Sequence, residues 1–206
     1  MSLGPAYRVV TPRLVVRCYT PSDAPLLQRA IESSLAHLRE FMPWAAREPE
    51  PIESRTERLR QFRGQFDLGQ DFVYGIFDAA EQECLGGTGL HTRQGPLIRE
   101  LGYWIAKAHV RKGYATEACN ALLQVAFRVD QVPRVEIRCE PSNVASASVA
   151  RKLGMKLEGT LRADTQRADG SFRDTLLFSA LKAELAELPA SSLSVQAYGA
   201  VGERLF

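Results

Sequence analysis

Residues 103–118 read YWIAKAHVRKGYATEA, in which a strand passes through a short basic turn into a long amphipathic helix. The first turn of a helix has backbone N–H groups without acceptors, and the helix dipole adds positive potential there. Gly113 has no Cβ to keep an anion away, and Arg111 and Lys112 add positive charge. The stretch therefore predicts an anion site over residues 110–116, with a geometry that suits a pyrophosphate.

Two common phosphate-binding motifs do not describe this turn. The G-x-x-x-x-G-K-[ST] spacing of a Walker A loop is missing, and so is the G-x-G-x-x-G of dinucleotide-binding folds. An ordinary strand-to-helix turn with solvated basic side chains is the alternative, because one glycine in a basic turn is a weak signal. The turn alone leaves both interpretations open.

Periodicity on either side of this turn predicts a mixed α+β sheet with helices on both faces. The helices are expected at residues 24–33, 35–41, 54–66, 113–129 and 143–153. The strands are expected at residues 14–17, 72–77, 84–90, 99–105, 135–139, 155–161 and 175–181. Asp169 and Gly170 predict a reversal between the last two strands.

Length and composition indicate one ordinary globular domain. The chain has 206 residues, 45% of them apolar and 24% charged, with a net charge of +2. That charge is too small to indicate non-specific binding to nucleic acid. We expect a single domain over residues 1–188 and a loosely attached C-terminal extension over residues 189–206, which is rich in Ser, Ala and Gly.

Cysteine usage and hydropathy favour a cytoplasmic protein without a metal centre. The cysteines form no C-x-x-C pair, and the histidines have no partner at metal-ligand spacing. Isolated cysteines in apolar runs are typical of reduced core residues. No apolar run is long enough for a membrane span, and the start of the chain lacks a signal-peptide pattern.

A second stretch reads EPSNVASASVARKLGM at residues 140–155. It favours the interpretation of residues 110–116 as a cofactor-binding turn over that of an ordinary turn. Together the two resemble the cofactor-binding motifs of the GNAT superfamily of N-acetyltransferases. They are most similar to the RimJ/RimL-like branch, which acetylates the N-termini of ribosomal proteins. The similarity runs over roughly residues 11–182, nearly the length of a typical single domain. Two positions depart from the family loop: Val110 stands where Gln or Arg is usual, and Arg111 where Gly is usual.

The resemblance implies a fold and a cofactor. The fold is a GNAT-like, mostly antiparallel sheet of about seven strands, with a V-shaped splay between the fourth and fifth. Acetyl-CoA would lie in that splay, and no metal is expected. A backbone N–H near Ile105 would serve as the oxyanion donor. Asn143 would bind the pantetheine, with a plain helix N-cap as its alternative role. The implied cofactor-binding residues are Ile105, Val110, Arg111, Lys112, Gly113, Tyr114, Ala115, Thr116, Asn143 and Ser146.

The catalytic candidates follow from the same resemblance. Many members place a tyrosine seven residues after the asparagine, but Ala150 stands there, whereas the serine of the RimL-like branch is present as Ser146 and would hydrogen-bond the departing sulfur. The glutamate proposed as a base in this branch is replaced by Thr165, so its neighbour Asp164 and the strand residue Glu100 are the candidates. The alternative for Glu100 and Asp164 is that they are ordinary surface carboxylates. The alternative for Ser146 is a local packing or capping role.

Two aromatic residues complete the expected site. Trp44 is expected to line the acceptor pocket, with packing on the core as its alternative role. Tyr103 and Trp104 alternate along one strand, so one belongs to the core and the other to the cofactor channel. Tyr103 is therefore a second substrate-binding candidate.

The resulting hypothesis is an acetyl-CoA-dependent N-acetyltransferase that acts on a primary amine, by direct attack in a ternary complex. The expected acceptor is the N-terminal amine of a protein or peptide. A small-molecule amine such as a polyamine, amino acid or aminoglycoside is one alternative. A non-catalytic acyl-CoA-binding module is another, because Ala150 and Thr165 replace family residues. Neither nucleic acid nor membrane is an expected partner, and both monomer and homodimer stay open.

Overall fold

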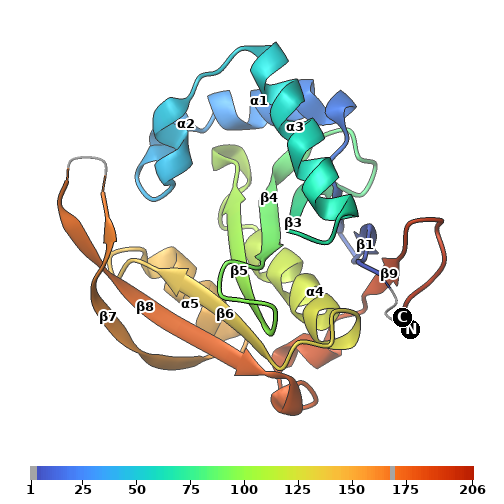
Figure 1. The fold of residues 1–206 in the computed structure, drawn as a ribbon, viewed down its shortest axis with the longest axis vertical. Helices are drawn as coiled ribbons and strands as arrows, with labels where there is room; N and C mark the ends of the chain where they lie inside the picture. Colours follow the sequence, from blue (N-terminus) through green and yellow to red (C-terminus); the bar gives the residue numbers. More distant parts are fainter. Residues whose placement is uncertain (1–3, 168–169) are drawn as a thin grey trace.

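The computed structural model describes residues 4–167 and 170–206, which form five α-helices and nine strands (Figure 1). The helices are α1 (Ala24–Glu32), α2 (Leu35–Arg39), α3 (Ile52–Asp67), α4 (Tyr114–Arg128) and α5 (Val144–Lys152). The strands are β1 (Arg8–Val10), β2 (Leu14–Cys18), β3 (Phe72–Asp78), β4 (Cys84–His91), β5 (Ile98–Ile105), β6 (Arg134–Cys139), β7 (Lys156–Gln166), β8 (Phe172–Leu181) and β9 (Gln196–Tyr198).

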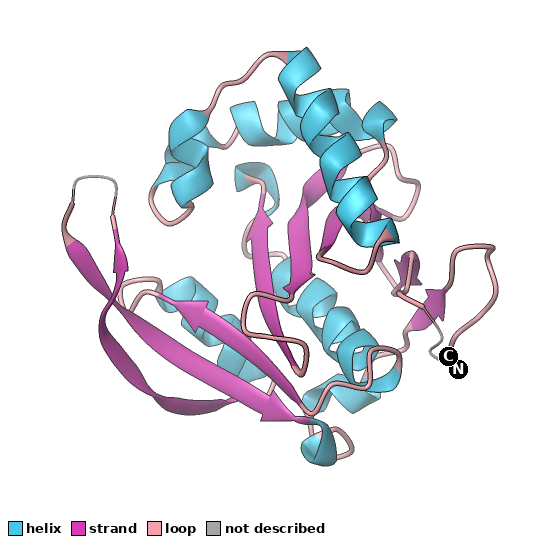
Figure 2. Ribbon diagram, in the orientation of Figure 1, coloured by secondary structure: helices cyan, strands magenta, loops and turns pink. Residues whose placement is uncertain are grey.

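All of these strands join one sheet, in the order β7-β8-β6-β5-β4-β3-β2-β1-β9 (Figure 2). Neighbouring strands are antiparallel except β5 and β6, which are parallel. The predicted class, a mostly antiparallel mixed sheet, is confirmed, but the described chain has nine strands where about seven were expected. The additional strands, β1 and β9, pair with each other and have three residues each, too few for an alternating pattern to show.

Helices cover both faces of the sheet, as predicted. Along β2, Leu14 and Val16 belong to one core cluster and Val15 to the other, because successive strand residues point to opposite faces. The helices α4 and α5 supply the first cluster, whereas α1 and α2 supply the second. Every residue of α4 from Glu117 to Phe127 is buried, so this helix is fixed against the sheet and its N-terminus is held beside the end of β5.

The strands β5 and β6 separate partway along their length. Their parallel pairing joins residues 98–100 to residues 134–136 and extends no further in the described chain, although β5 continues to Ile105 and β6 to Cys139. The free ends diverge (Figure 1). This is the splay expected between the fourth and fifth of the predicted strands, and it places the ends of β5 and β6 around a shared opening.

The end of the chain is part of the sheet. β9 pairs with β1, Ala197 is fully buried, and Val195 is also in the core. The expectation of a loose attachment for this segment is therefore wrong, because its two apolar residues close the edge of the sheet beside β1. Of the predicted reversal between β7 and β8, Asp169 lies outside the described residues, and Gly170 adopts a positive φ of 85°.

Candidate active site

The basic turn between β5 and α4 has the backbone expected of an anion site. Arg111 (φ 64°) and Gly113 (φ 85°) both adopt the left-handed conformation, which turns the chain tightly into the helix. Gly113 is the helix N-cap, and within the described chain no side chain caps the first turn. The amides of Tyr114, Ala115 and Thr116 are therefore left for solvent or a ligand.

An ion pair between the exposed Arg13 and the buried Glu117 braces this turn from the side of β2. Arg13 donates from Nε to Oε2 of Glu117 (2.7 Å) and from Nη1 to the carbonyl of Lys112 (3.0 Å). The hydroxyl of Thr11 donates to Oε1 of Glu117 at 2.7 Å. A Cβ added to Gly113 would lie 3.3 Å from Nη2 of Arg13. The brace holds the turn in place while Arg111 and Lys112 remain exposed.

The amide of Ile105 points into the splay. In the β4–β5 ladder Leu85 accepts from Ala106 at 2.8 Å, and Gly86 lies opposite Ile105. Hydrogen-bonded and non-hydrogen-bonded pairs alternate in an antiparallel ladder, so the N–H of Ile105 faces away from β4, toward β6. The β5–β6 pairing ends at Glu100, and this N–H is therefore beyond the last ladder bond on that side.

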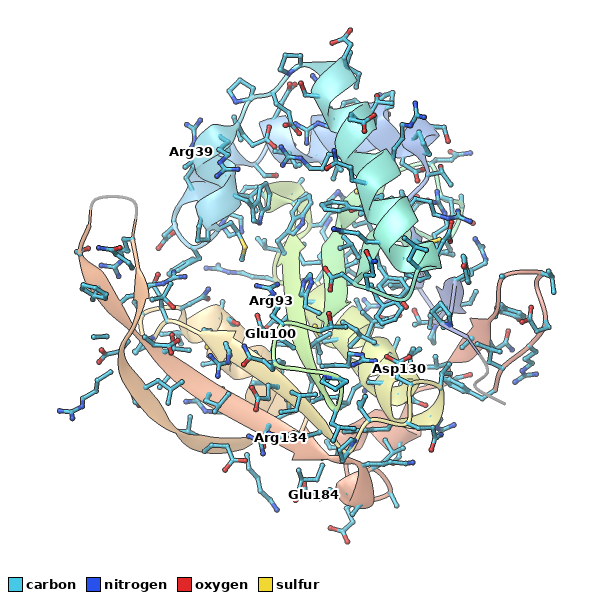
Figure 3. The ribbon with its side chains drawn as sticks, viewed as in Figure 1. Arg39, Arg93, Glu100, Asp130, Arg134 and Glu184 are labelled. Atoms are coloured by element: carbon cyan, nitrogen blue, oxygen red, sulfur yellow. The ribbon has the colours of Figure 1, made fainter. Side chains whose placement is uncertain are left out.

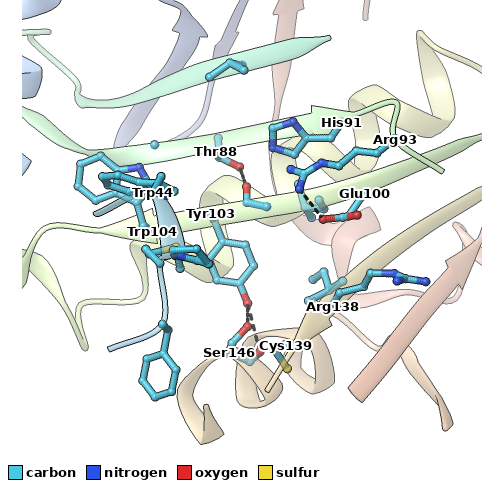
Figure 4. A pocket seen from close by; sticks show the side chains of 18 of the residues that line it. Trp44, Thr88, His91, Arg93, Glu100, Tyr103, Trp104, Arg138, Cys139 and Ser146 are labelled. Carbon is cyan, nitrogen blue, oxygen red and sulfur yellow. Dashed lines mark hydrogen bonds and ion pairs between the residues drawn. The ribbon is translucent and has the colours of Figure 1, made fainter. Parts of the chain in front are cut away.

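The start of α5 lies against β5 on the other side of the opening. Asn143 is its N-cap and accepts a hydrogen bond through Oδ1 from the amide of Ser146 (3.0 Å), so the capping role is present. The hydroxyl of Tyr103 donates to the carbonyl of Ser146 (3.1 Å) and lies 2.9 Å from its Oγ. Burial raises the pKa of the Tyr103 hydroxyl well above its usual range, which keeps it protonated. Tyr103 and Ser146 thus form a hydroxyl pair beside the splay (Figure 4).

One cavity of about 760 Å³ joins most of the predicted catalytic residues. It lies among the helical layer, the face of β4 and β5, and the strands β6 and β8. The predicted site residues that line it are Trp44, Glu100, Tyr103, Asn143, Ser146 and Asp164. Residues 110–116 and Ile105 are outside its lining.

The two predicted base candidates both have a guanidinium close by. Oε1 of Glu100 lies 3.4 Å from Nη1 of Arg93, and its Oε2 accepts from Gln94 at 3.2 Å. Arg93 and Glu100 lie in the middle of the molecule (Figure 3). Asp164 lies 3.7 Å from Nη1 of Arg138.

Two further titratable groups in the cavity were not predicted from the sequence. His91, at the end of β4, contacts Asp71 through Nδ1 at 2.9 and 3.1 Å. Glu140 follows β6 and is paired with Arg173 of β8 and with Arg167 at 2.7 Å. Burial raises the pKa of Glu140, but the two guanidinium hydrogen bonds outweigh it, and the net pKa is lowered. No local motif marks either group, because the first pairing depends on the register of the β3–β4 hairpin and the second on the approach of β6 to β8.

An aromatic pair lies near the helical end of the cavity. The rings of Trp44, in the 3-10 helix Pro43–Arg47, and Trp104 of β5 meet edge to face with centroids 5.8 Å apart. Both line the cavity. Their acceptor-binding role stays a prediction.

Residues 4–167 and 170–206 contain neither a metal-ligand cluster nor a membrane-crossing helix. No group of three or more His, Cys, Asp or Glu side chains there is placed to hold a metal ion. No helix there has the length and apolar character needed to cross a bilayer.

Comparisons with known proteins agree with this geometry. The acetyltransferase (GNAT) domain model matches residues 13–156. The uncharacterized N-acetyltransferase p20 of Bacillus licheniformis is 37% identical over 119 residues, which are 57% of this chain and 66% of p20, just under two thirds of its length. The [ribosomal protein uS5]-alanine N-acetyltransferase of Escherichia coli (strain K12) is 28% identical over 178 residues, 84% of this chain and 90% of the relative.

A solved structure shows the same fold. RimL, the ribosomal L7/L12 alpha-N-protein acetyltransferase in complex with coenzyme A, superimposes with a TM-score of 0.74 at 21% identity, covering 84% of this chain and 96% of the RimL chain. The family model spans well over half of the chain, and the splayed sheet is the one that the family motifs implied. The chain belongs to the GNAT family of N-acetyltransferases.

Proposed function

We propose that this enzyme uses acetyl-CoA to acetylate the N-terminal amine of a protein or peptide, by direct attack within a ternary complex. The observation that carries the proposal is the arrangement at the splay. The Ile105 amide faces the opening, the Tyr103–Ser146 hydroxyl pair flanks it, and a cavity for an acceptor adjoins it. Relatives with this specificity include the E. coli enzyme named for ribosomal protein uS5 and the L7/L12 enzyme RimL.

The residues around the splay fit the parts of acetyl-CoA. The uncapped amides after Gly113, with the helix dipole, suit the pyrophosphate, and Arg111 and Lys112 add positive charge. Binding through backbone groups explains why Val110 and Arg111 can replace the usual family residues. The amide nitrogen of Asn143 remains for the pantetheine, because its Oδ1 is occupied by the helix cap.

The Ile105 amide and the hydroxyl pair suit the two charges that the reaction develops. An N–H that already faces the splay stabilises the oxyanion of the attacked carbonyl without reorganisation. The Tyr103 hydroxyl has two acceptors on Ser146, so it can turn from the carbonyl to Oγ while the Ser146 proton turns to the departing sulfur. A thiolate is a fair leaving group, and a weak donor is enough.

The charges of the cavity favour a peptide over a polyamine. Among the described lining residues are five arginines (Arg55, Arg58, Arg93, Arg138 and Arg173) and five carboxylates (Glu48, Asp71, Glu100, Glu140 and Asp164). A polyamine carries only positive charge and would suit an acidic pocket. A mixed lining offers both donors and acceptors to the carbonyls and side chains of a peptide.

A turnover assay tests the proposal. Each reaction contains the enzyme, acetyl-CoA and one acceptor, which is an N-terminal peptide, a polyamine, an amino acid or an aminoglycoside. The release of the coenzyme A thiol is measured. We expect turnover with peptides, loss of cofactor affinity in Asn143→Ala and loss of kcat in Ser146→Ala. Turnover confined to small amines would refute the peptide specificity. Tight CoA binding without turnover on the whole panel would favour a non-catalytic module.

A further inference from the structure

His91 and Asp71 form a hydrogen-bonded pair within the cavity, apart from the residues that the function above uses. His91 Nδ1 lies 2.9 Å from Oδ2 and 3.1 Å from Oδ1 of Asp71. Burial raises the pKa of Asp71, but the hydrogen bond and charge of His91 outweigh it, and the net pKa is lowered. When the ring is neutral, an ionised carboxylate at Nδ1 holds the proton there, so Nε2 presents its lone pair.

Two glycines leave room for the Nε2 edge of the ring over the sheet. A Cβ at Gly89 would lie 2.8 Å from Nε2, and one at Gly102 would lie 3.2 Å from it. The register places Gly89 and Gly102 opposite each other on β4 and β5. The imidazole therefore rests on bare backbone, and no Cβ of this glycine pair stands between Nε2 and the cavity. The same cavity is lined by Ser146, at its sulfur-binding end.

Three other carboxylates of the cavity, on Glu140, Glu100 and Asp164, already have cationic or hydrogen-bonding neighbours. Glu140 is clamped by two guanidinium groups that lower its pKa. Glu100 has Arg93 and Gln94 on its oxygens, and Asp164 has Arg138 as a neighbour. In the close view of the cavity His91, Arg93 and Glu100 are grouped on one side and Ser146 on the other, with Tyr103 between them (Figure 4).

We propose that Nε2 of His91 is the general base of the acetyl transfer and that Asp71 is its positioning residue; this rests on the proposed function. The amine lone pair forms the N–C bond, the C–S bond breaks, and the N–H proton passes to Nε2, directly or through one water. The departing thiolate accepts a hydrogen bond from the Ser146–Tyr103 hydroxyl pair and takes its proton from water, and the protonated His91 returns its proton to the solvent. A general base is typically worth about 10²–10⁴ in rate.

The test compares two histidine variants of the full chain, with acetyl-CoA and the best peptide of the panel. His91→Gln is expected to lose about 100-fold in kcat, within the range for a general base, while its CoA affinity in calorimetry stays within about twofold of the wild type. His37→Gln is the matched control, because His37 lies on α2 outside the lining of the cavity, and it should keep the full rate.

Chemical rescue separates a base from a packing role. Imidazoles of increasing basicity added to His91→Ala should restore turnover, with a rate that rises with their basicity. The charged groups facing the ring are Asp71, Arg93 after β4, and Glu100 of β5. Asp71→Asn removes the carboxylate that holds Nδ1 of His91, so kcat should fall while KM for the peptide stays unchanged.

The outcomes distinguish the two proposals. Two outcomes would overturn the role of His91 and leave the proposed function unaffected. In the first, the wild type turns over and His91→Gln keeps the full rate. In the second, His91→Ala is folded but no imidazole restores its turnover. A wild type that binds CoA and acetylates no amine of the panel would refute both.

Discussion

The Tyr103–Ser146 hydroxyl pair gives the sharpest prediction at the scale of single residues. Tyr103→Phe keeps the ring and removes the hydroxyl that lies 2.9 Å from Ser146 Oγ. We expect kcat to fall about tenfold, the equivalent of about 1.4 kcal/mol in the barrier, with an unchanged affinity for CoA. Tyr198→Phe, in β9, is the control. Steady-state kinetics and calorimetry measure both, and a fully active Tyr103→Phe would remove the pair from the mechanism.

Substitution by alanine should have opposite effects on stability at Gly113 and at Gly64. Gly113 has a φ of 85° and a Cβ there would approach Arg13, whereas Gly64 is inside α3 with open space around it. Gly113→Ala should cost about 1–2 kcal/mol for the left-handed backbone and weaken CoA binding. Gly64→Ala should gain about 0.5–1 kcal/mol, because alanine favours a helix. Thermal unfolding and CoA titration compare them, and equal effects would contradict the role given to the turn.

The sequence could not reveal the His91–Asp71 pair because of one irregularity. In the β3–β4 hairpin Phe72 lies opposite Leu90, so Asp71 and His91 flank the end of the ladder. A β-bulge at Ile76 and Phe77 shifts the register by one residue. Counting outward from the turn would therefore have placed Asp71 opposite Leu90, and a one-residue slip moves every side chain to the other face. By contrast, Asn143 was predictable as the N-cap of a helix, whereas Ser146 was named only through the family resemblance.

At the scale of elements, Glu140 connects the end of β6 to β8. Its folded-state pKa is lowered, so its stabilising effect is present above the unfolded value near 4.5 and is lost as the pH falls through the folded value. Glu140→Gln should therefore show a smaller loss of unfolding free energy than the wild type on acidification from pH 7 to about pH 3.

The matched control for this pH experiment is Glu57→Gln, because the Glu57 side chain is 60% exposed and its ion-pair partner is Arg60. Urea unfolding at each pH gives the free energies. The same acid sensitivity in Glu140→Gln and the wild type would show that the clamp to Arg173 and Arg167 adds nothing to the link between β6 and β8.

Elements were predictable where they were long. The helices α4 and α5 were expected within a residue or two, because their apolar positions recur at helical spacing. The splay was expected only through the family resemblance, since divergence of two strands leaves no local pattern. β1 and β9 were missed because three residues give no period.

At the scale of the whole molecule, the tail completes the sheet and the core. Deleting residues 194–206 removes β9, the buried Val195 and Ala197, and the ring of Phe206 beneath Arg128. We expect a loss of at least about 3 kcal/mol, seen as a fall in Tm of roughly 6–12 °C. Val201→Ser is the control, because Val201 is 90% exposed in the same segment. An unchanged Tm on deletion would show instead that the C-terminal extension is loosely attached.

The central claim is that the splay and its cavity acetylate a peptide N-terminus. Mass spectrometry of the product tests it most directly, with a peptide that carries both a free α-amine and an internal lysine, and a matched peptide whose α-amine is blocked. We expect a single acetyl group on the α-amine of the first peptide and none on the second. Acetylation of the lysine in both peptides would contradict the proposed function. So would the absence of acetylation in both peptides together with acetylation of a free small amine.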